Sequence, residues 1–197
     1  QNKTLIFNCT MLFMEKPDSW NRVLSDKVAD CRVFRVRRDT CIRDRDGKSS
    51  DFFVIENPDW VNIIAINEAD EVVLIEQFRH GTEEIELELP GGLIDDGEEP
   101  EAAAKRELLE ETGYSSNRWT LLGKSRPNPA IQNNTIYHYL ALASEKTSET
   151  AFDQHESIAT KLVLRDKIDT LIGDGSVTHS LVVAAFYYLS RTNENLL

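Results

Sequence analysis

Residues 91–114 read GGLIDDGEEPEAAAKRELLEETGY, a run dense in carboxylates whose second part has the features of a helix. Pro100 stands where a first helical turn tolerates proline, because the missing N–H would have no partner there. Gly113 follows the last helical residue, as a helix-ending glycine does. The stretch therefore predicts a helix over residues 99–112, preceded by an acidic loop.

The predicted helix carries three glutamates on one face. Side chains three or four positions apart point the same way from a helix, so Glu107, Glu110 and Glu111 project together. Their like charges repel, and such a face either stays solvated or binds a cation. Mg²⁺ prefers carboxylate oxygens and commonly shares its coordination shell with substrate phosphate. A metal ion on this face would reconcile an acidic protein with an anionic substrate.

The spacing of the glycine and charged residues favours the metal site. Gly92 is followed after five residues by Glu98, and after seven more by Arg106 and the segment ELLEETGY, which includes Gly113. This pattern resembles the Nudix box, G-x5-E-x7-R-E-U-x-E-E-x-G-U, at every charged and glycine position. Tyr114 is the one departure, at a packing position where the pattern usually has an aliphatic residue.

The resemblance implies a hydrolase in which divalent cations bind a diphosphate that water then cleaves. Glu107 and Glu111 correspond to the principal metal ligands, Glu110 to a further ligand, and the carbonyl of Gly91 to a backbone ligand. The implied cofactor is Mg²⁺, with Mn²⁺ as a substitute.

Four residues of the box correspond to structural positions: Gly92, Glu98, Arg106 and Gly113. Glu98 and Arg106 match the charged pair that braces the loop against the helix in relatives.

The resemblance extends over most of the chain to the branch that includes ADP-ribose pyrophosphatases. It rests on the segments NPDWVNIIAI (57–66), VLIEQFRHG (73–81), ELPGG (88–92), RPNPAIQNN (126–134) and VTHSLVVAAFYYL (177–189).

Three substrate-binding residues are implied by this branch. Arg79 matches an arginine that contacts the substrate, although a surface pairing with Glu83 or Glu84 is the alternative. Arg126 is a candidate by its loop position. Pro129 falls where the branch has an informal specificity mark, although it also suits a simple turn.

Hydrolysis also needs a base, for which the sequence offers two candidates. Glu156 matches a glutamate on a loop between the box and the C-terminal helices. The family often has a further glutamate shortly afterwards, where this chain reads Ile158-Ala159-Thr160. Glu107 is the other candidate, acting on water whose pKa a metal ion lowers. The four histidines read as structural groups, since no pair has zinc-ligand spacing.

The remaining pattern interleaves strands and helices. Alternation predicts antiparallel pairs at 30–37 with 52–55 and at 61–66 with 71–78, and strands at 84–89, 117–123, 136–143 and 158–164, with helices at 166–175 and 177–189. Segment 84–89, EIELEL, should place its glutamates on one face. The fold class predicted is α+β, an α/β/α Nudix-type sandwich with a mixed sheet and a small N-terminal antiparallel β element.

The chain divides into three parts on this reading. Residues 1–13 are an extension or an added segment, residues 14–56 an N-terminal β subdomain, and residues 57–197 the Nudix hydrolase domain. The resemblance implies a homodimer in which the N-terminal β elements are exchanged between subunits.

The composition restricts the partners. The net charge of −12 over 197 residues disfavours nucleic acid and anionic membranes. No apolar stretch approaches the length of a membrane-spanning helix. Three cysteines without metal-site spacing favour a reducing compartment, so we expect a cytoplasmic protein.

The activity implied is metal-dependent hydrolysis of a nucleoside diphosphate derivative, with ADP-ribose giving AMP and ribose 5-phosphate as the first hypothesis. The same chemistry on GDP-mannose, NADH or a dinucleoside polyphosphate is the second. A non-catalytic nucleotide-sensing module is the third, although such sensors tend to lose box carboxylates that this chain retains.

Overall fold

The computed structural model describes residues 16–151 and 157–192. The predicted extension at residues 1–13 and the candidate base Glu156 lie outside the described residues.

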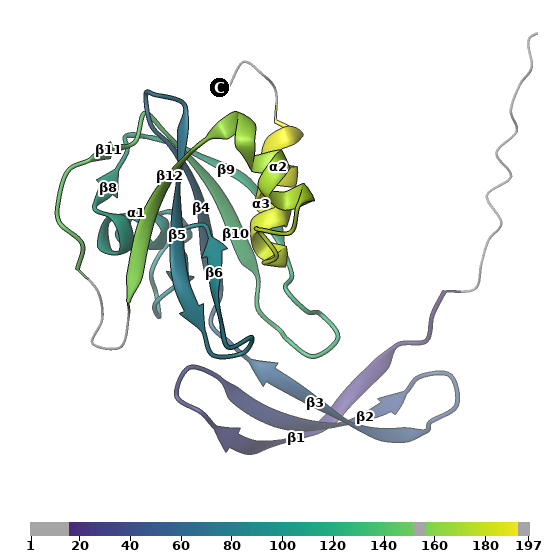
Figure 1. The fold of residues 1–197 in the computed structure, drawn as a ribbon. Coiled ribbons are helices and arrows are strands. Elements are labelled where there is room, and N and C mark those ends of the chain that lie inside the picture. The colour runs from purple at the N-terminus through teal and green to yellow at the C-terminus, as the bar shows by residue number, and fades with distance from the viewer. Residues whose placement is uncertain (1–15, 152–156, 193–197) are drawn as a thin grey trace, which may run out of the picture.

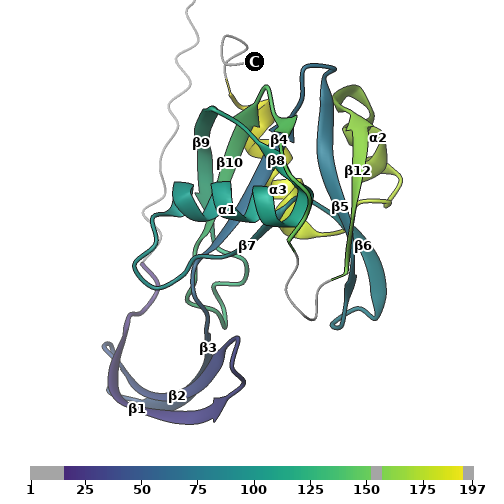
Figure 2. The same cartoon turned by 90° about the vertical axis from the view of Figure 1, so that its left-hand side faces the viewer.

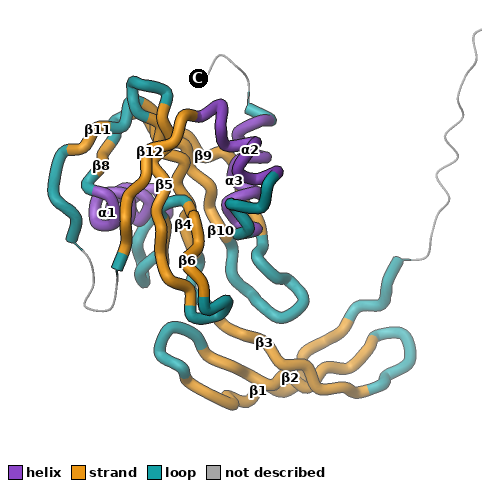
Figure 3. The backbone as a smooth tube through the Cα atoms, viewed as in Figure 1, coloured by secondary structure: helices purple, strands orange, loops and turns teal. Residues whose placement is uncertain are grey.

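A seven-stranded mixed sheet forms the centre of the molecule (Figures 1 and 3). Its main path runs β12 (Ile158–Leu164), β5 (Glu71–Arg79), β4 (Trp60–Ile66), β10 (Ile136–Leu142) and β9 (Arg118–Ser125). The pairing of β4 with β10 is parallel, and the other pairings are antiparallel. The predicted mixed sheet is therefore confirmed.

Helices cover both faces of this sheet. Helix α1 (Pro100–Thr112) lies on one face, and α2 (Ile168–Gly173) with α3 (Ser180–Ser190) lies on the other (Figure 1). Alternate residues of β4 serve opposite layers: Ile63 packs with the α1 side, whereas Ile64 packs with the α3 side. Two buried clusters result, and the α/β/α sandwich is confirmed.

Short elements complete the body. They are β8 (Tyr114–Ser115), which pairs with β11 (Glu145–Lys146), and the 3-10 helix η1 (Arg165–Lys167). Helix α3 begins at Ser180 rather than at the predicted residue 177. The preceding Thr178 contacts the sheet through its side chain instead.

The central sheet forks between β4 and β5. These strands pair only at Ala65 with Val73 and at Ile66 with Val72. Beyond that point β7 (Gly91–Leu93) takes the edge of β4, and β6 (Glu84–Glu88) takes the edge of β5. The fork leaves space between two arms of one sheet, directly beside the residues that lead into α1.

A separate three-stranded sheet precedes the body and extends away from it (Figures 1 and 2). It comprises β1 (Trp20–Asp30), β2 (Arg35–Arg43) and β3 (Ser49–Glu56), all antiparallel. The predicted antiparallel pair of 30–37 with 52–55 is confirmed in part, since Val36 of β2 pairs with Ile55 of β3. The strand begins at Arg35 rather than at residue 30, because residues 31–34 form the turn between β1 and β2. Strand β1 was missed since most of its side chains are exposed on both faces, which removes the alternating pattern that marks a half-buried strand.

The loop at residues 126–135, between β9 and β10, forms hydrogen bonds with the end of the N-terminal sheet. The amide of Ile55 donates to the carbonyl of Ile131 at 2.7 Å, and the amide of Asn57 donates to Oδ1 of Asn133 at 3.1 Å. The loop is thereby held against the chain that leaves β3.

Candidate functional site

A cavity of about 920 Å³ occupies the fork of the sheet, within the size range of small-molecule sites. Its walls come from α1, from β5 and β6, from the β4 and β7 edge, and from the start of α3. The ionisable residues that line it are Arg79, His80, Glu86, Glu88, Asp95, Arg106, Glu107, Glu110, Glu111 and His179.

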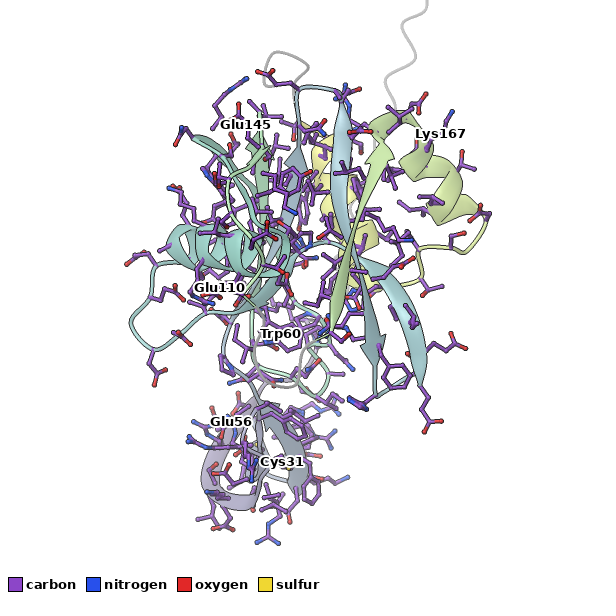
Figure 4. The ribbon with its side chains drawn as sticks, turned by 60° about the vertical axis from the view of Figure 1, so that its left-hand side comes forward. Cys31, Glu56, Trp60, Glu110, Glu145 and Lys167 are labelled. Atoms are coloured by element: carbon purple, nitrogen blue, oxygen red, sulfur yellow. The ribbon has the colours of Figure 1, made fainter. Side chains whose placement is uncertain are left out.

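The three glutamates of α1 reach this cavity from one wall. Helix α1 begins at Pro100 and ends where Gly113 adopts a left-handed conformation with φ of 74°. Glu111 is buried, Glu107 is half-buried, and Glu110 is the most exposed of the three side chains. In Figure 4, Trp60 lies between the helix that carries Glu110 and the N-terminal sheet that carries Glu56. Helical periodicity thus delivers three carboxylates to the same wall, as the sequence predicted.

Arg106 supplies the positive charge that compensates this face. Its Nε and Nη2 donate to the two carboxylate oxygens of Glu98 at 3.0 and 2.9 Å. Its Nη1 donates to Oε1 of Glu107 at 2.8 Å and to Oε2 of Glu110 at 3.2 Å. These bonds raise the pKa of Arg106, and the Arg106 hydrogen bond lowers the pKa of Glu98. Glu98 and Arg106 therefore tie the acidic loop to the helix.

The backbone before the helix lies directly against two of the carboxylates. The amide of Gly91 donates to Oε2 of Glu111 at 2.8 Å. A Cβ atom at Gly91 would lie 2.2 Å from the carbonyl oxygen of Val61, and one at Gly92 would lie 2.4 Å from Oε1 of Glu107. At Gly91 a side chain would collide with the backbone of β4, whereas at Gly92 it would displace the carboxylate of Glu107.

The donor atoms of this wall fit a divalent cation. Among the lining residues, six carboxylates face only two guanidinium groups, so negative charge is in excess in the cavity. Carboxylate oxygens are the ligands that Mg²⁺ and Mn²⁺ take. Across residues 16–151 and 157–192 no set of three or more His, Cys, Asp or Glu side chains is arranged to hold a metal ion. In this structure Arg106 bonds Glu107 and Glu110, and the Gly91 amide bonds Glu111.

The opposite wall carries Arg79. Its Nε and Nη2 donate to the two oxygens of Glu88 at 2.6 and 2.9 Å. Glu88, rather than the predicted alternatives Glu83 or Glu84, accepts both of these bonds. Nε2 of His179 lies 4.0 Å from the same carboxylate. The Arg79 side chain thus belongs to the cavity wall.

Glu86, Glu88 and His179 were not predicted as site residues. A signal was present in EIELEL, whose alternation places Glu86 and Glu88 on one face of β6. That face is the cavity side, and the usual order is inverted: Ile85 is 70% exposed, whereas Glu88 is buried. Polarity alone does not reveal which face of an isolated strand will be covered.

Arg126 and Pro129 do not reach the cavity. Both are exposed, and neither lines it. Their loop is instead attached to the connection between β3 and β4. The structure of one chain therefore does not bring these two predicted substrate contacts together with the acidic wall.

Fold and site together define an α/β/α protein with an acidic helix and an arginine facing each other across a small-molecule cavity. The model of the NUDIX domain family matches residues 57–185. This chain belongs to the NUDIX domain family.

Known proteins match almost the whole chain. The methanol dehydrogenase activator of Bacillus methanolicus is 28% identical over 179 residues, covering 90% of this chain and 94% of that protein. The ADP-ribose pyrophosphatase of Bacillus subtilis (strain 168) is 27% identical over 176 residues, covering 89% and 92%. A crystal structure of an ADP compounds hydrolase superposes with a TM-score of 0.79 at 25% identity, covering 90% of this chain and 96% of that one.

These comparisons confirm the predicted membership of the ADP-ribose pyrophosphatase-like branch and the prediction of a Nudix pyrophosphohydrolase, which acts on nucleoside diphosphates. Nudix hydrolases generally use divalent metal ions. No helix in the described part of the chain combines the length and the apolar character needed to cross a membrane.

Proposed function

We propose that this enzyme hydrolyses ADP-ribose to AMP and ribose 5-phosphate. The observation that carries the proposal is the pairing of an acidic wall with Arg79 across one cavity of about 920 Å³. A diphosphate needs cations on one side and directed donors on the other, and this cavity offers a place for both. The name of the Bacillus subtilis relative supports ADP-ribose as the substrate.

Glu107 and Glu111 are the proposed principal ligands of Mg²⁺, with Glu110 and the carbonyl of Gly91 as further ligands and Mn²⁺ as a substitute. When bound, the ion supplies charge neutralisation for the diphosphate and makes water a better nucleophile near neutral pH. Glu111 is pre-positioned by the Gly91 amide. Arg106 keeps its two bonds to Glu98 and so holds the helix in register with the loop.

Substrate binding and base catalysis are assigned to side chains of this protein. Arg79 binds phosphate oxygens, for which the planar guanidinium is suited. Glu107, in the cavity, and Glu156, beyond the described residues, are the two proposed bases. Substituting each by glutamine distinguishes them, because the variant that loses its base loses the rise of kcat with pH in the acidic range.

A second substrate class is favoured by a specific finding. The solved structure that resembles this chain is described as an ADP compounds hydrolase, and so is a relative in Escherichia coli (strain K12) that is 42% identical over 74 residues. Hydrolysis of other ADP-containing compounds, NADH among them, is therefore the second candidate.

The N-terminal sheet is proposed to form a homodimer. Val23, Leu24, Val28, Phe52 and Phe53 on its strands are exposed large hydrophobic side chains. Apolar patches of this kind mark interaction surfaces. A second copy of the chain would cover them and would bring residues 14–56 close to a partner's hydrolase domain. We also propose that the protein is cytoplasmic, which the free thiols of Cys31 and Cys41 support.

The test is incubation of the protein with ADP-ribose, NADH, GDP-mannose and a dinucleoside polyphosphate, with Mg²⁺, with Mn²⁺ and with EDTA. We expect AMP and ribose 5-phosphate, released only with metal and fastest from ADP-ribose. Glu111→Gln should keep the fold and lose at least about 100-fold in kcat. Faster cleavage of another compound would make that compound the substrate instead of ADP-ribose, and tight binding without cleavage would indicate a sensor.

A further inference from the structure

The path of the Arg79 side chain along its wall is unexpected. In the antiparallel ladder of β5 and β6, Arg79 lies opposite Glu84, Gln77 opposite Glu86, and Ile75 opposite Glu88. Cross-strand ion pairs normally form between direct partners. Arg79 instead passes the carboxylates of two nearer positions and bonds to Glu88, the one furthest along the strand. Its guanidinium is thereby drawn from the rim of the wall toward the interior.

The pair is asymmetric in its burial. The side chain of Glu88 is 4% exposed, whereas that of Arg79 is 42% exposed. A buried carboxylate requires a full set of partners, because its charge is costly to desolvate. Nε2 of His179, at 4.0 Å, is too distant for a hydrogen bond, whereas Nε and Nη2 of Arg79 each donate to one oxygen of Glu88. The carboxylate is thus fixed in the protein while the guanidinium remains accessible from the cavity.

The neighbouring carboxylate is occupied separately. Glu86 accepts a hydrogen bond from the hydroxyl of Thr178 at 2.7 Å, and this bond lowers the pKa of Glu86. Thr178 precedes α3, so the wall is assembled from β5, β6 and a segment distant in sequence. Thr178 therefore bonds Glu86, while Arg79 bonds Glu88.

We infer that Glu88 is a positioning residue, which draws the Arg79 guanidinium into the cavity and fixes its plane so that it meets the substrate diphosphate in one orientation. The inference rests on the proposed function, in which Arg79 binds phosphate. Two bonds to Nε and Nη2 hold the whole plane of a guanidinium group, because that group is rigid. Glu88 itself touches no substrate, and its effect passes through Arg79.

The test compares Glu88→Gln with Glu84→Gln, a matched control on the same face of the same strand outside the cavity lining. The assay uses whichever nucleoside diphosphate the wild type cleaves fastest. For Glu88→Gln we expect KM to rise about 10- to 100-fold while kcat changes less than about threefold, since a contact made equally in ground and transition states affects KM. Glu84→Gln should change KM less than about twofold.

Two further variants separate positioning from folding. Glu88→Asp keeps the charge but shortens the side chain, and it should show the same rise in KM. In an Arg79→Gln background, Glu88→Gln should add no further loss, because both changes remove one interaction. Additive losses, or an unchanged KM in both Glu88 variants, would overturn the inference. Absence of cleavage by the wild type would instead refute the proposed function.

Discussion

Replacing Gly92 by alanine places a methyl group against the carboxylate of Glu107. The added Cβ would lie 2.4 Å from Oε1, 2.5 Å from Cδ and 2.8 Å from Oε2 of Glu107. Ordinary van der Waals contact begins at 3.4 Å, so the carboxylate must retreat by about 1 Å. The backbone need not move, because the obstructing atoms are the far end of a flexible side chain.

The expected effects on stability and activity are therefore different. A displacement of about 1 Å in a catalytic group costs on the order of 100-fold in rate. The free energy of unfolding should change by less than about 1 kcal/mol, since alanine also restricts the unfolded chain and offsets part of the strain. Gly92→Ala should thus be a folded protein with little turnover.

Two other glycines supply the controls. At Gly91 the Cβ would lie 2.2 Å from the backbone oxygen of Val61, so Gly91→Ala must separate β7 from β4 and should cost about 3 kcal/mol of stability. At Gly173 a Cβ would meet nothing within 4 Å, so Gly173→Ala should leave turnover unchanged and raise the free energy of unfolding by up to about 1 kcal/mol.

The assays are ADP-ribose turnover with Mg²⁺ and thermal unfolding followed by circular dichroism. In a chain of this size 1 kcal/mol corresponds to a Tm shift of roughly 2–4 °C. If Gly92→Ala unfolds like the wild type and retains kcat within about threefold, the position of the Glu107 carboxylate does not limit catalysis, and its assignment as ligand or base is refuted.

Three other predictions concern charge, burial and assembly. The Arg106 hydrogen bond lowers the pKa of Glu98 from 4.5, so this carboxylate contributes stability above pH 4.5 that is lost as pH falls through its folded pKa. Arg106→Gln should lower the free energy of unfolding by about 2 kcal/mol at pH 7. In urea unfolding, this free energy should also fall less steeply with decreasing pH than in the wild type, and equal slopes in the two proteins would contradict the prediction. Burial lowers the pKa of His138 from 6.5 to about 4, so the folded state keeps the ring neutral, and about 3 kcal/mol of stability present above pH 6.5 should be lost by pH 4. In His138→Leu, the free energy of unfolding measured with urea should change little between these pH values. A pH dependence equal to that of the wild type would show that another group titrates. Light scattering should give wild type the mass of two chains and Phe53→Asp the mass of one, whereas a single-chain wild type would exclude the dimer.

The acidic wall was predictable because its geometry is local. The relation of Glu107 to Glu110 and Glu111 depends only on helical periodicity, and Pro100 and Gly113 marked the ends of that helix. The strand at Ile158–Leu164 was predicted at its observed bounds because its pattern is also local.

The opposite wall was not predictable in the same way. The alternation of EIELEL put Glu88 on one face but could not show that this face would be covered while Ile85 stays exposed. The pairing of Glu88 with Arg79 depends on which strands pair and on how far the Arg79 side chain reaches along them. Thr178 and His179 join the wall from the other end of the chain, through contacts that no spacing in the sequence encodes.

The sequence by itself determined the glutamates that share a face of α1, since they follow from residue types at short, regular separations, and it indicated the family and the sandwich through the resemblance of the box. Only the tertiary structure decided that the sheet forks beside the box, that Glu88 rather than Glu84 holds Arg79, and that the loop of Arg126 and Pro129 joins the N-terminal sheet. The physical reason is that burial, register and long-range pairing depend on which surfaces the folded chain brings together, whereas periodicity depends only on neighbours along the chain.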